Sequence, residues 1–149
     1  MHEKVLRLKT PEDCESFAKN VEEKYPDLAR EARRRAVELK ATAYGAEKES
    51  EREALQAVYA AEAALSAKNG KKTRASRTWQ SIARWGLLQT VERVVCNRKE
   101  TDAYKALVAM HMADFTFESV VVRHPDDFSA ETLACAQKRL AEQQGGAHA

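Results

Sequence analysis

Residues 55–65 read Leu-Gln-Ala-Val-Tyr-Ala-Ala-Glu-Ala-Ala-Leu, and this stretch decides the fold class. Side chains at spacings of three and four residues fall on one face of an α-helix. The residues on that face are Leu55, Val58, Tyr59, Glu62 and Leu65. Alanine, which fills most other positions, loses least on entering a helix. Asn69-Gly70 is a typical helix end, so the sequence predicts one long helix over about 46–68.

Two further helices are predicted before this one, over about 10–24 and 27–44. Thr10-Pro11 supplies an N-cap hydroxyl and a proline at the first helical position. Pro26 interrupts the pattern and Gly45 ends it again. Three helices with short connections predict an antiparallel N-terminal bundle over residues 1–69.

The remainder of the chain also follows helical spacing. The predicted helices cover about 76–85, 87–95, 101–110, 113–124 and 129–143. Gly86 separates the first two, and Ser76 is the expected N-cap of the first. The valines of 120–122 favour a strand by composition, but the spacing of 117, 120, 121 and 124 favours a helix, which we predict.

The fold class expected from these patterns is all-α, a multi-helix bundle of about six to seven helices in a single domain, residues 1–149. Its expected parts are the N-terminal three-helix bundle, 1–69, and a basic connector with a C-terminal helical subdomain, 70–149. Only 5 glycines and 3 prolines in 149 residues argue against an all-β protein with many turns.

Composition excludes several classes of protein. Hydrophobic residues make up 44% and charged residues 32%, which fits neither a disordered chain nor a membrane protein. No apolar run approaches the roughly 20 residues of a membrane span. Residues 1–7 carry charges where a signal peptide needs apolar residues. Cys14, Cys96 and Cys135 show no Cys-x-x-Cys spacing, which predicts free thiols, no structural zinc and a cytoplasmic protein, with Cys96 a buried small hydrophobe.

The charge is distributed unevenly along the chain. The formal net charge is +2, yet residues 70–99 hold 8 Lys/Arg and one acidic residue, Glu92. Charge segregation of this kind favours a charged partner.

The basic block mixes cations with hydroxyl and amide side chains. Cations attract phosphates and release counterions, while hydroxyls donate directed hydrogen bonds. The sequence therefore predicts a nucleic-acid-binding surface, DNA or RNA, made of Lys71, Lys72, Arg74, Ser76, Arg77, Trp79 and Arg84. Trp79 is expected either to stack on a base or to lie in the core.

A second basic cluster lies in the predicted helix 27–44. Arg30, Arg33 and Arg34 share one helix face and form a possible secondary binding face. A solvated face balanced by Glu31 and Glu38 is the favoured interpretation.

Alternatives to a phosphate-binding surface remain open. The helices on either side of Gly86 have the outline of a helix-turn-helix, although Gly86 leaves almost no turn. A helical interaction module whose basic block docks on an acidic protein partner is the second hypothesis, with a homodimer as a further possibility.

The sequence predicts no enzyme, no cofactor and no metal site. His111 with Asp114 and Glu118 is expected roughly on one helix face, and His124 precedes two acids. These residues place a metal-dependent nuclease a distant third, because the sequence has no metal-binding, phosphate-loop or nucleophile motif.

Residues 71–80, Gly86, Val91-Glu92-Arg93, Phe117-Glu118 and Arg123-His124-Pro125 together resemble a group of short, uncharacterised, all-helical bacterial proteins. The resemblance spans most of the chain. It implies a bacterial or mobile-element origin and brings no activity.

Overall fold

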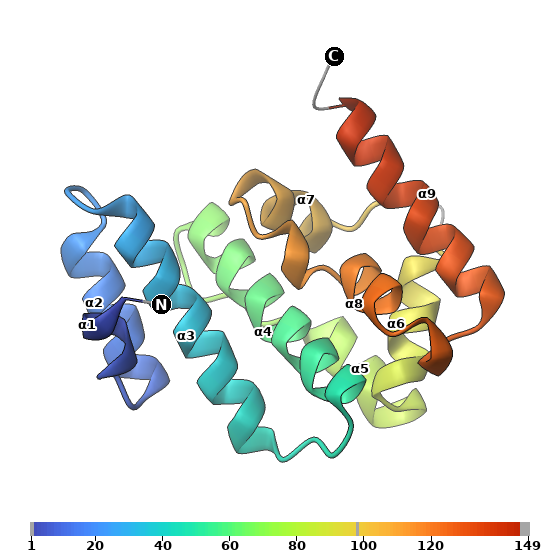
Figure 1. Ribbon diagram of the computed structural model, residues 1–149, viewed down its shortest axis with the longest axis horizontal. Coiled ribbons are helices and arrows are strands. Elements are labelled where there is room, and N and C mark those ends of the chain that lie inside the picture. The colour runs from blue at the N-terminus through green and yellow to red at the C-terminus, as the bar shows by residue number, and fades with distance from the viewer. Residues whose placement is uncertain (1, 98, 147–149) are drawn as a thin grey trace. The chain divides into compact units, whose positions relative to one another are not determined.

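The computed structural model describes residues 2–97 and 99–146, and the regular structure within this part is entirely helical (Figure 1). The α-helices are α1 (Glu3–Leu6), α2 (Pro11–Val21), α3 (Pro26–Tyr44), α4 (Glu49–Asn69), α5 (Ser76–Trp85), α6 (Leu87–Val95), α7 (Asp102–Ala109), α8 (Phe117–Arg123) and α9 (Ala130–Gly146). Two 3-10 helices, η1 (Ala113–Phe115) and η2 (Pro125–Asp127), flank α8. The predicted all-α class is confirmed.

The sequence predicted one continuous helix over 113–124, whereas the structure forms two helices there. Thr116 has an extended backbone, and its Oγ1 accepts a hydrogen bond from the Ser119 amide at 3.2 Å, so Thr116 caps a new helix. The chain therefore forms η1, a cap and then α8. The valines of 120–122 lie inside α8, which confirms helix over strand at that point.

The chain divides into two compact units, Met1–Ala46 and Glu47–Ala149. The sequence placed its finest division near residue 70, whereas the structure assigns α4 to the second unit, because α4 packs against α6, α7 and α8. In the first unit α2 and α1 pack on α3 around Val5, Ala18, Ala29 and Ala32.

The second unit is organised around α4. Seven hydrophobic side chains of α4 are buried, five of them alanines, and small side chains permit close helix packing. Its main apolar cluster consists of Ala54, Ala57, Val91, Val95, Val120, Val121, Phe128 and Ala136. This cluster joins α4 to α6, α8 and α9.

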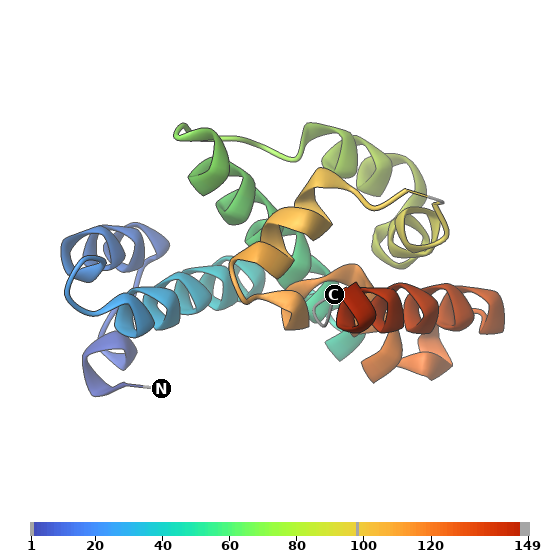
Figure 2. The same ribbon diagram turned by 90° about the horizontal axis from the view of Figure 1, so that it is seen from above.

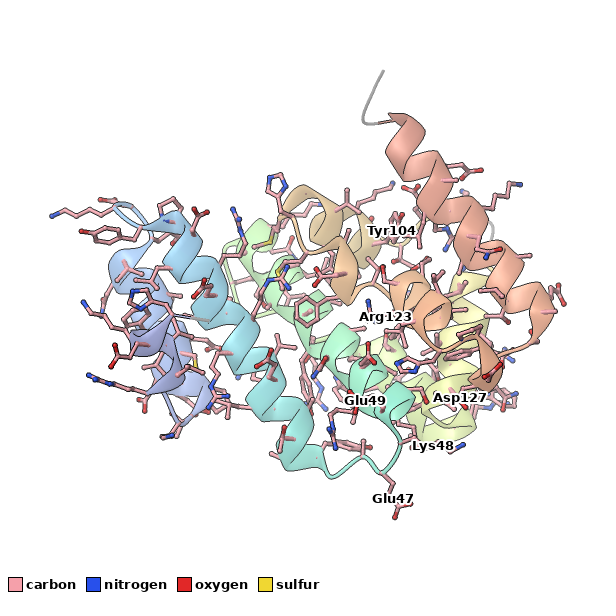
Figure 3. All side chains as sticks on the ribbon, in the orientation of Figure 1. Glu47, Lys48, Glu49, Tyr104, Arg123 and Asp127 are labelled. Carbon is pink, nitrogen blue, oxygen red and sulfur yellow. The ribbon has the colours of Figure 1, made fainter. Side chains whose placement is uncertain are left out.

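Two polar networks brace the second unit. Glu118 and Arg139 form a buried ion pair of 2.8 Å between α8 and α9, and Tyr104 donates to the Arg139 carbonyl at 3.4 Å (Figure 3). Glu53 of α4 accepts hydrogen bonds from Arg123 and His124 at the end of α8. Helix α8 is therefore fixed on both sides.

Gly86 joins α5 to α6 as a single linking residue, as the sequence predicted. Its φ of 88° and ψ of 168° belong to a backbone region that is essentially restricted to glycine. Gly70, at the end of α4, has φ 69° and ψ 15°, a left-handed conformation that asparagine tolerates.

We expect Gly86→Asn to lower the free energy of unfolding by about 2 kcal/mol, because the backbone region is strained for any residue with a Cβ. The added Cβ would meet nothing within 4 Å, so the cost comes from the backbone alone. Gly70→Asn is the matched control and should cost well under about 1 kcal/mol. Urea unfolding checks both, and equal losses would contradict the assignment.

Candidate nucleic-acid interface

The basic connector between α4 and α5 is anchored to the end of α4. Ser66 Oγ accepts a hydrogen bond from the Thr73 amide at 2.8 Å and donates to the Thr73 carbonyl at 3.2 Å. Asn69 Nδ2 donates to Thr73 Oγ1 at 3.1 Å. The connector leads from the end of α4 to the start of α5 (Figure 2). Its cations are therefore carried on a backbone that is held at Thr73.

Glu62, one turn before Ser66 on α4, holds the start of α5. Its Oε2 accepts a hydrogen bond from the Ala75 amide at 2.9 Å and a second from Trp79 Nε1 at 2.8 Å. Ala75 is the residue that precedes the first turn of α5, and Trp79 lies one turn into it. A single carboxylate thus fixes both the position and the rotation of the helix.

Trp79 is half-buried between α4 and the connector. Its ring centroid lies 5.4 Å from that of Tyr59, with the rings tilted by 54°. The Arg74 guanidinium carbon lies 5.7 Å from the Trp79 centroid. These contacts and the bond to Glu62 give Trp79 a structural role in joining α5 to α4.

Ser76 does not cap α5, contrary to the prediction. Ala75 is the N-cap residue, and Ser76 is the first residue of the helix with an exposed side chain. The start of α5 is instead held by Glu62, a contact that the local pattern around Ser76 does not reveal.

The predicted cations all lie on the surface of the second unit. The structure exposes Lys71, Lys72, Arg74, Arg77 and Arg84. Within residues 2–97 and 99–146, none of these five side chains forms an ion pair with a carboxylate. Positive charge on this surface is thus left for solvent or a ligand.

Several arginines elsewhere in the chain form ion pairs with neighbouring acids. Arg7 pairs with Glu3 at 2.8 Å, and Arg52 pairs with Glu49 at 3.2 Å. What distinguishes the basic surface is the density of its charge, because residues 70–99 hold 8 Lys/Arg and one acidic residue.

The secondary basic face on α3 is balanced by nearby acids. Arg30 pairs with Asp27 at 3.4 Å, and Arg33 pairs with Glu22 at 3.1 Å. The partners differ from the predicted Glu31 and Glu38, but the favoured interpretation, a solvated face with local charge balance, agrees with these pairs. Arg34 also has an interaction.

The structure adds two residues that the sequence prediction left out. Trp85, the last residue of α5, is 36% exposed. The guanidinium carbons of Arg84 and Arg93 lie 4.8 Å and 4.5 Å from its ring centroid. Arg93 belongs to α6, which packs on α5, and Ser81 and Thr90 hydrogen-bond across the two helices at 3.1 Å. In the sequence, the position of Trp85 directly after Arg84 was the one sign that Trp85 could belong to the basic surface.

The residues considered for catalysis do not share one helix face. His111 is exposed between α7 and η1, with a φ of 58°, and Glu118 is buried on α8 against Arg139, so the expected shared helix face does not form. His124 contacts Glu53 instead of an aspartate. Within the described part of the chain, no three His, Cys, Asp or Glu side chains are grouped to hold a metal ion.

The two carboxyl groups that hold α8, those of Glu53 and Glu118, have shifted pKa values. Burial raises the pKa of Glu53, but hydrogen bonds from His124 and Arg123 lower it more, so that the pKa lies below its usual value. Burial raises the pKa of Glu118, although the bond from Arg139 opposes this. Both groups are engaged in helix packing.

Cys96 is exposed, which corrects the prediction of a buried position. It is the C-cap residue that follows α6, and its thiol lies 3.7 Å from Thr132 Oγ1 of α9. A hydrogen bond with Cys96, together with burial, raises the pKa of Cys135. All three cysteines are free in the structure.

A small cavity of about 80 Å³ lies among α4, α5, α6, α7, η1 and α8, lined mainly by apolar side chains. No helix in the described part of the chain has the length and hydropathy needed to cross a bilayer.

Comparison of the chain with protein-family models, with curated proteins and with solved structures finds no match. The resemblance to short bacterial proteins therefore stays a prediction.

We expect Glu62→Ala to lower the free energy of unfolding by about 1–3 kcal/mol, since it removes the acceptor of two part-buried donors. Glu51→Ala on the same helix is the matched control, because Glu51 is also half-buried and accepts no hydrogen bond from a described residue. Urea unfolding followed by tryptophan fluorescence compares them. The same midpoint for both variants would show that Glu62 does not hold α5.

Proposed function

We propose that the protein binds nucleic acid, mainly through backbone phosphates, on the basic surface formed by the connector and α5. The surface consists of Lys71, Lys72, Arg74, Arg77 and Arg84, with the Ser76 hydroxyl beside them. The observation that carries the proposal is the grouping of five exposed cations on one short segment, none of which forms an ion pair with a carboxylate within the described residues. No catalytic step is assigned to the chain.

Physical reasoning supports a ligand for these charges. Like charges held together repel one another and do not stabilise a fold, so an unbalanced cluster is better explained by a partner. The hydrogen bonds of Thr73 and Glu62 also hold the connector and α5 in place, which reduces the ordering cost of binding.

Phosphate is the ligand that this surface fits best. Arginine guanidinium groups bind phosphate oxygens in a bidentate manner, and lysines bind them as point charges. Hydroxyl groups such as that of Ser76 are also common phosphate contacts. An acidic protein is the second candidate, because its carboxylates can pair with the same cations.

The salt dependence of binding tests the phosphate contacts. In fluorescence anisotropy with labelled oligonucleotides, log affinity should fall linearly with log salt, by about 0.7 to 0.9 per neutralised phosphate. Lys72→Ala with Arg77→Ala should make the slope less steep by about 1.4 to 1.8 and weaken all sequences alike.

Lys48→Ala with Arg52→Ala is the matched control. It removes one lysine and one arginine at the other end of α4, where Figure 3 shows Lys48 and Glu49. Arg52 already pairs with Glu49 there. An equal loss of slope in this control would indicate general charge attraction rather than the proposed surface. If no oligonucleotide binds at low salt, the nucleic-acid proposal is wrong and the acidic-protein candidate takes its place.

A further inference from the structure

The corner between α5 and α6 carries an exposed aromatic ring. Within the described part of the second unit, Trp85 is the aromatic side chain that the structure leaves exposed, with 36% of its surface accessible. Trp79, the other tryptophan, is half-buried and bonded to Glu62. A large ring left at the surface beside cations suits a partner with a flat π-face.

Two guanidinium groups converge on this ring from two different helices. Arg84 comes from α5 and Arg93 from α6, and both guanidinium carbons lie within 5 Å of the Trp85 centroid. Neither side chain forms an ion pair with a carboxylate among the described residues. The ring and the guanidinium groups therefore form a cationic cluster of flat side chains, the stacking cluster Arg84–Trp85–Arg93.

Such a cluster recognises unpaired nucleobases. A base stacks on an aromatic ring or on a guanidinium plane only when its own face is accessible. In a duplex the faces are stacked inside and only the base edges and the phosphates are exposed. A stacking cluster therefore favours single-stranded over duplex nucleic acid.

Helix α6 does not suit insertion into a groove. Thr90, Val91 and Val95 are buried, and Glu92 accepts hydrogen bonds from Ser129 and Thr132 of the segment that begins α9. The helix packs against α4, α5, α8 and α9. Its one-residue connection to α5 also differs from the three- or four-residue turn of a helix-turn-helix.

The stacking cluster continues the basic surface. Arg84 belongs to both, and α5 has ten residues, which corresponds to a length of about 15 Å. A strand whose phosphates contact Lys71, Lys72 and Arg77 can therefore follow α5 to Trp85.

We propose that the ligand is single-stranded nucleic acid, one unpaired base of which stacks on Trp85 and the guanidinium groups of Arg84 and Arg93. This inference rests on the proposed function. It adds the strandedness of the ligand and assigns to Trp85 the stacking role that the sequence offered as one of two alternatives for Trp79.

Fluorescence anisotropy titrations test the proposal. The ligands are a labelled 12-nucleotide single strand, as DNA and as RNA, and the matching blunt duplex. We expect the single strands to bind more tightly than the duplex at equal salt. Trp85→Ala should weaken single-strand binding about 5- to 150-fold, because stacking on an aromatic side chain contributes roughly 1–3 kcal/mol per base. Its salt slope should stay unchanged, since no phosphate contact is lost.

Two further variants make the test specific. Tyr25→Ala removes an exposed aromatic ring of the first unit, 60% accessible, and should leave binding unchanged. Arg93→Lys keeps the charge but removes a flat guanidinium group, so it should weaken single-strand binding without altering the salt slope. Arg93→Lys replaces only an exposed side chain, so it provides the test even if Trp85→Ala does not fold.

The outcomes separate the two proposals. No binding of any oligonucleotide would overturn the proposed function itself. The stacking proposal alone would be overturned by a second set of results. In it, single strand and duplex bind with equal affinity, and Arg93→Lys and Trp85→Ala have no effect on binding. The salt slope still depends on Lys72 and Arg77. Single strands bound more tightly than the duplex, together with weaker binding by Trp85→Ala and Arg93→Lys, would support the stacking, and the tighter of RNA and DNA would identify the sugar.

Discussion

The position of the basic surface depends on one carboxylate. Glu62 of α4 accepts hydrogen bonds from the Ala75 amide and from the Trp79 indole, and so ties the beginning of α5 to the central helix of the second unit. Ser66 and Asn69 extend the same polar face of α4 and hold Thr73. Without these bonds, the connector would be a flexible loop and α5 would contact the rest of the unit mainly through α6.

The two tryptophans of α5 have different roles: Trp79 stabilises the contact with α4, and Trp85 belongs to the proposed binding surface. Trp79 packs beside Tyr59 and donates to Glu62, whereas Trp85 is exposed with the guanidinium groups of Arg84 and Arg93 near its ring. Since both residues belong to the same ten-residue helix, the bond that fixes Trp79 also sets the direction in which Trp85 and Arg77 face. Helix α5 therefore carries both the contact that joins it to α4 and part of the proposed binding surface.

Much of the fold was predictable because helix formation here depends on local patterns. The alanine-rich stretch 55–65 predicted α4, and Gly86 predicted the break between α5 and α6. The break at Thr116 was missed, because a threonine cap inside an apolar pattern competes with helix continuation, and the pattern alone does not show which prevails.

The candidate site was predictable in composition but not in geometry. The charge imbalance of residues 70–99 indicated the basic surface directly. The role of Glu62 depends on contacts 13 and 17 residues away in the sequence, and the cluster around Trp85 depends on Arg93 from the next helix. The role of Glu62 had one signal in the sequence. The polar residues Glu62, Ser66 and Asn69 follow one another at helical spacing on a face that is otherwise apolar.

A nuclear magnetic resonance titration that follows the two indole N–H signals tests this account most directly. On addition of a short single-stranded oligonucleotide, we predict a large shift of the Trp85 signal, because a stacked base changes its ring environment. The Trp79 signal should stay in place, because Glu62 holds that N–H. A shift confined to Trp79, or no shift of either signal at saturating oligonucleotide, would contradict the account.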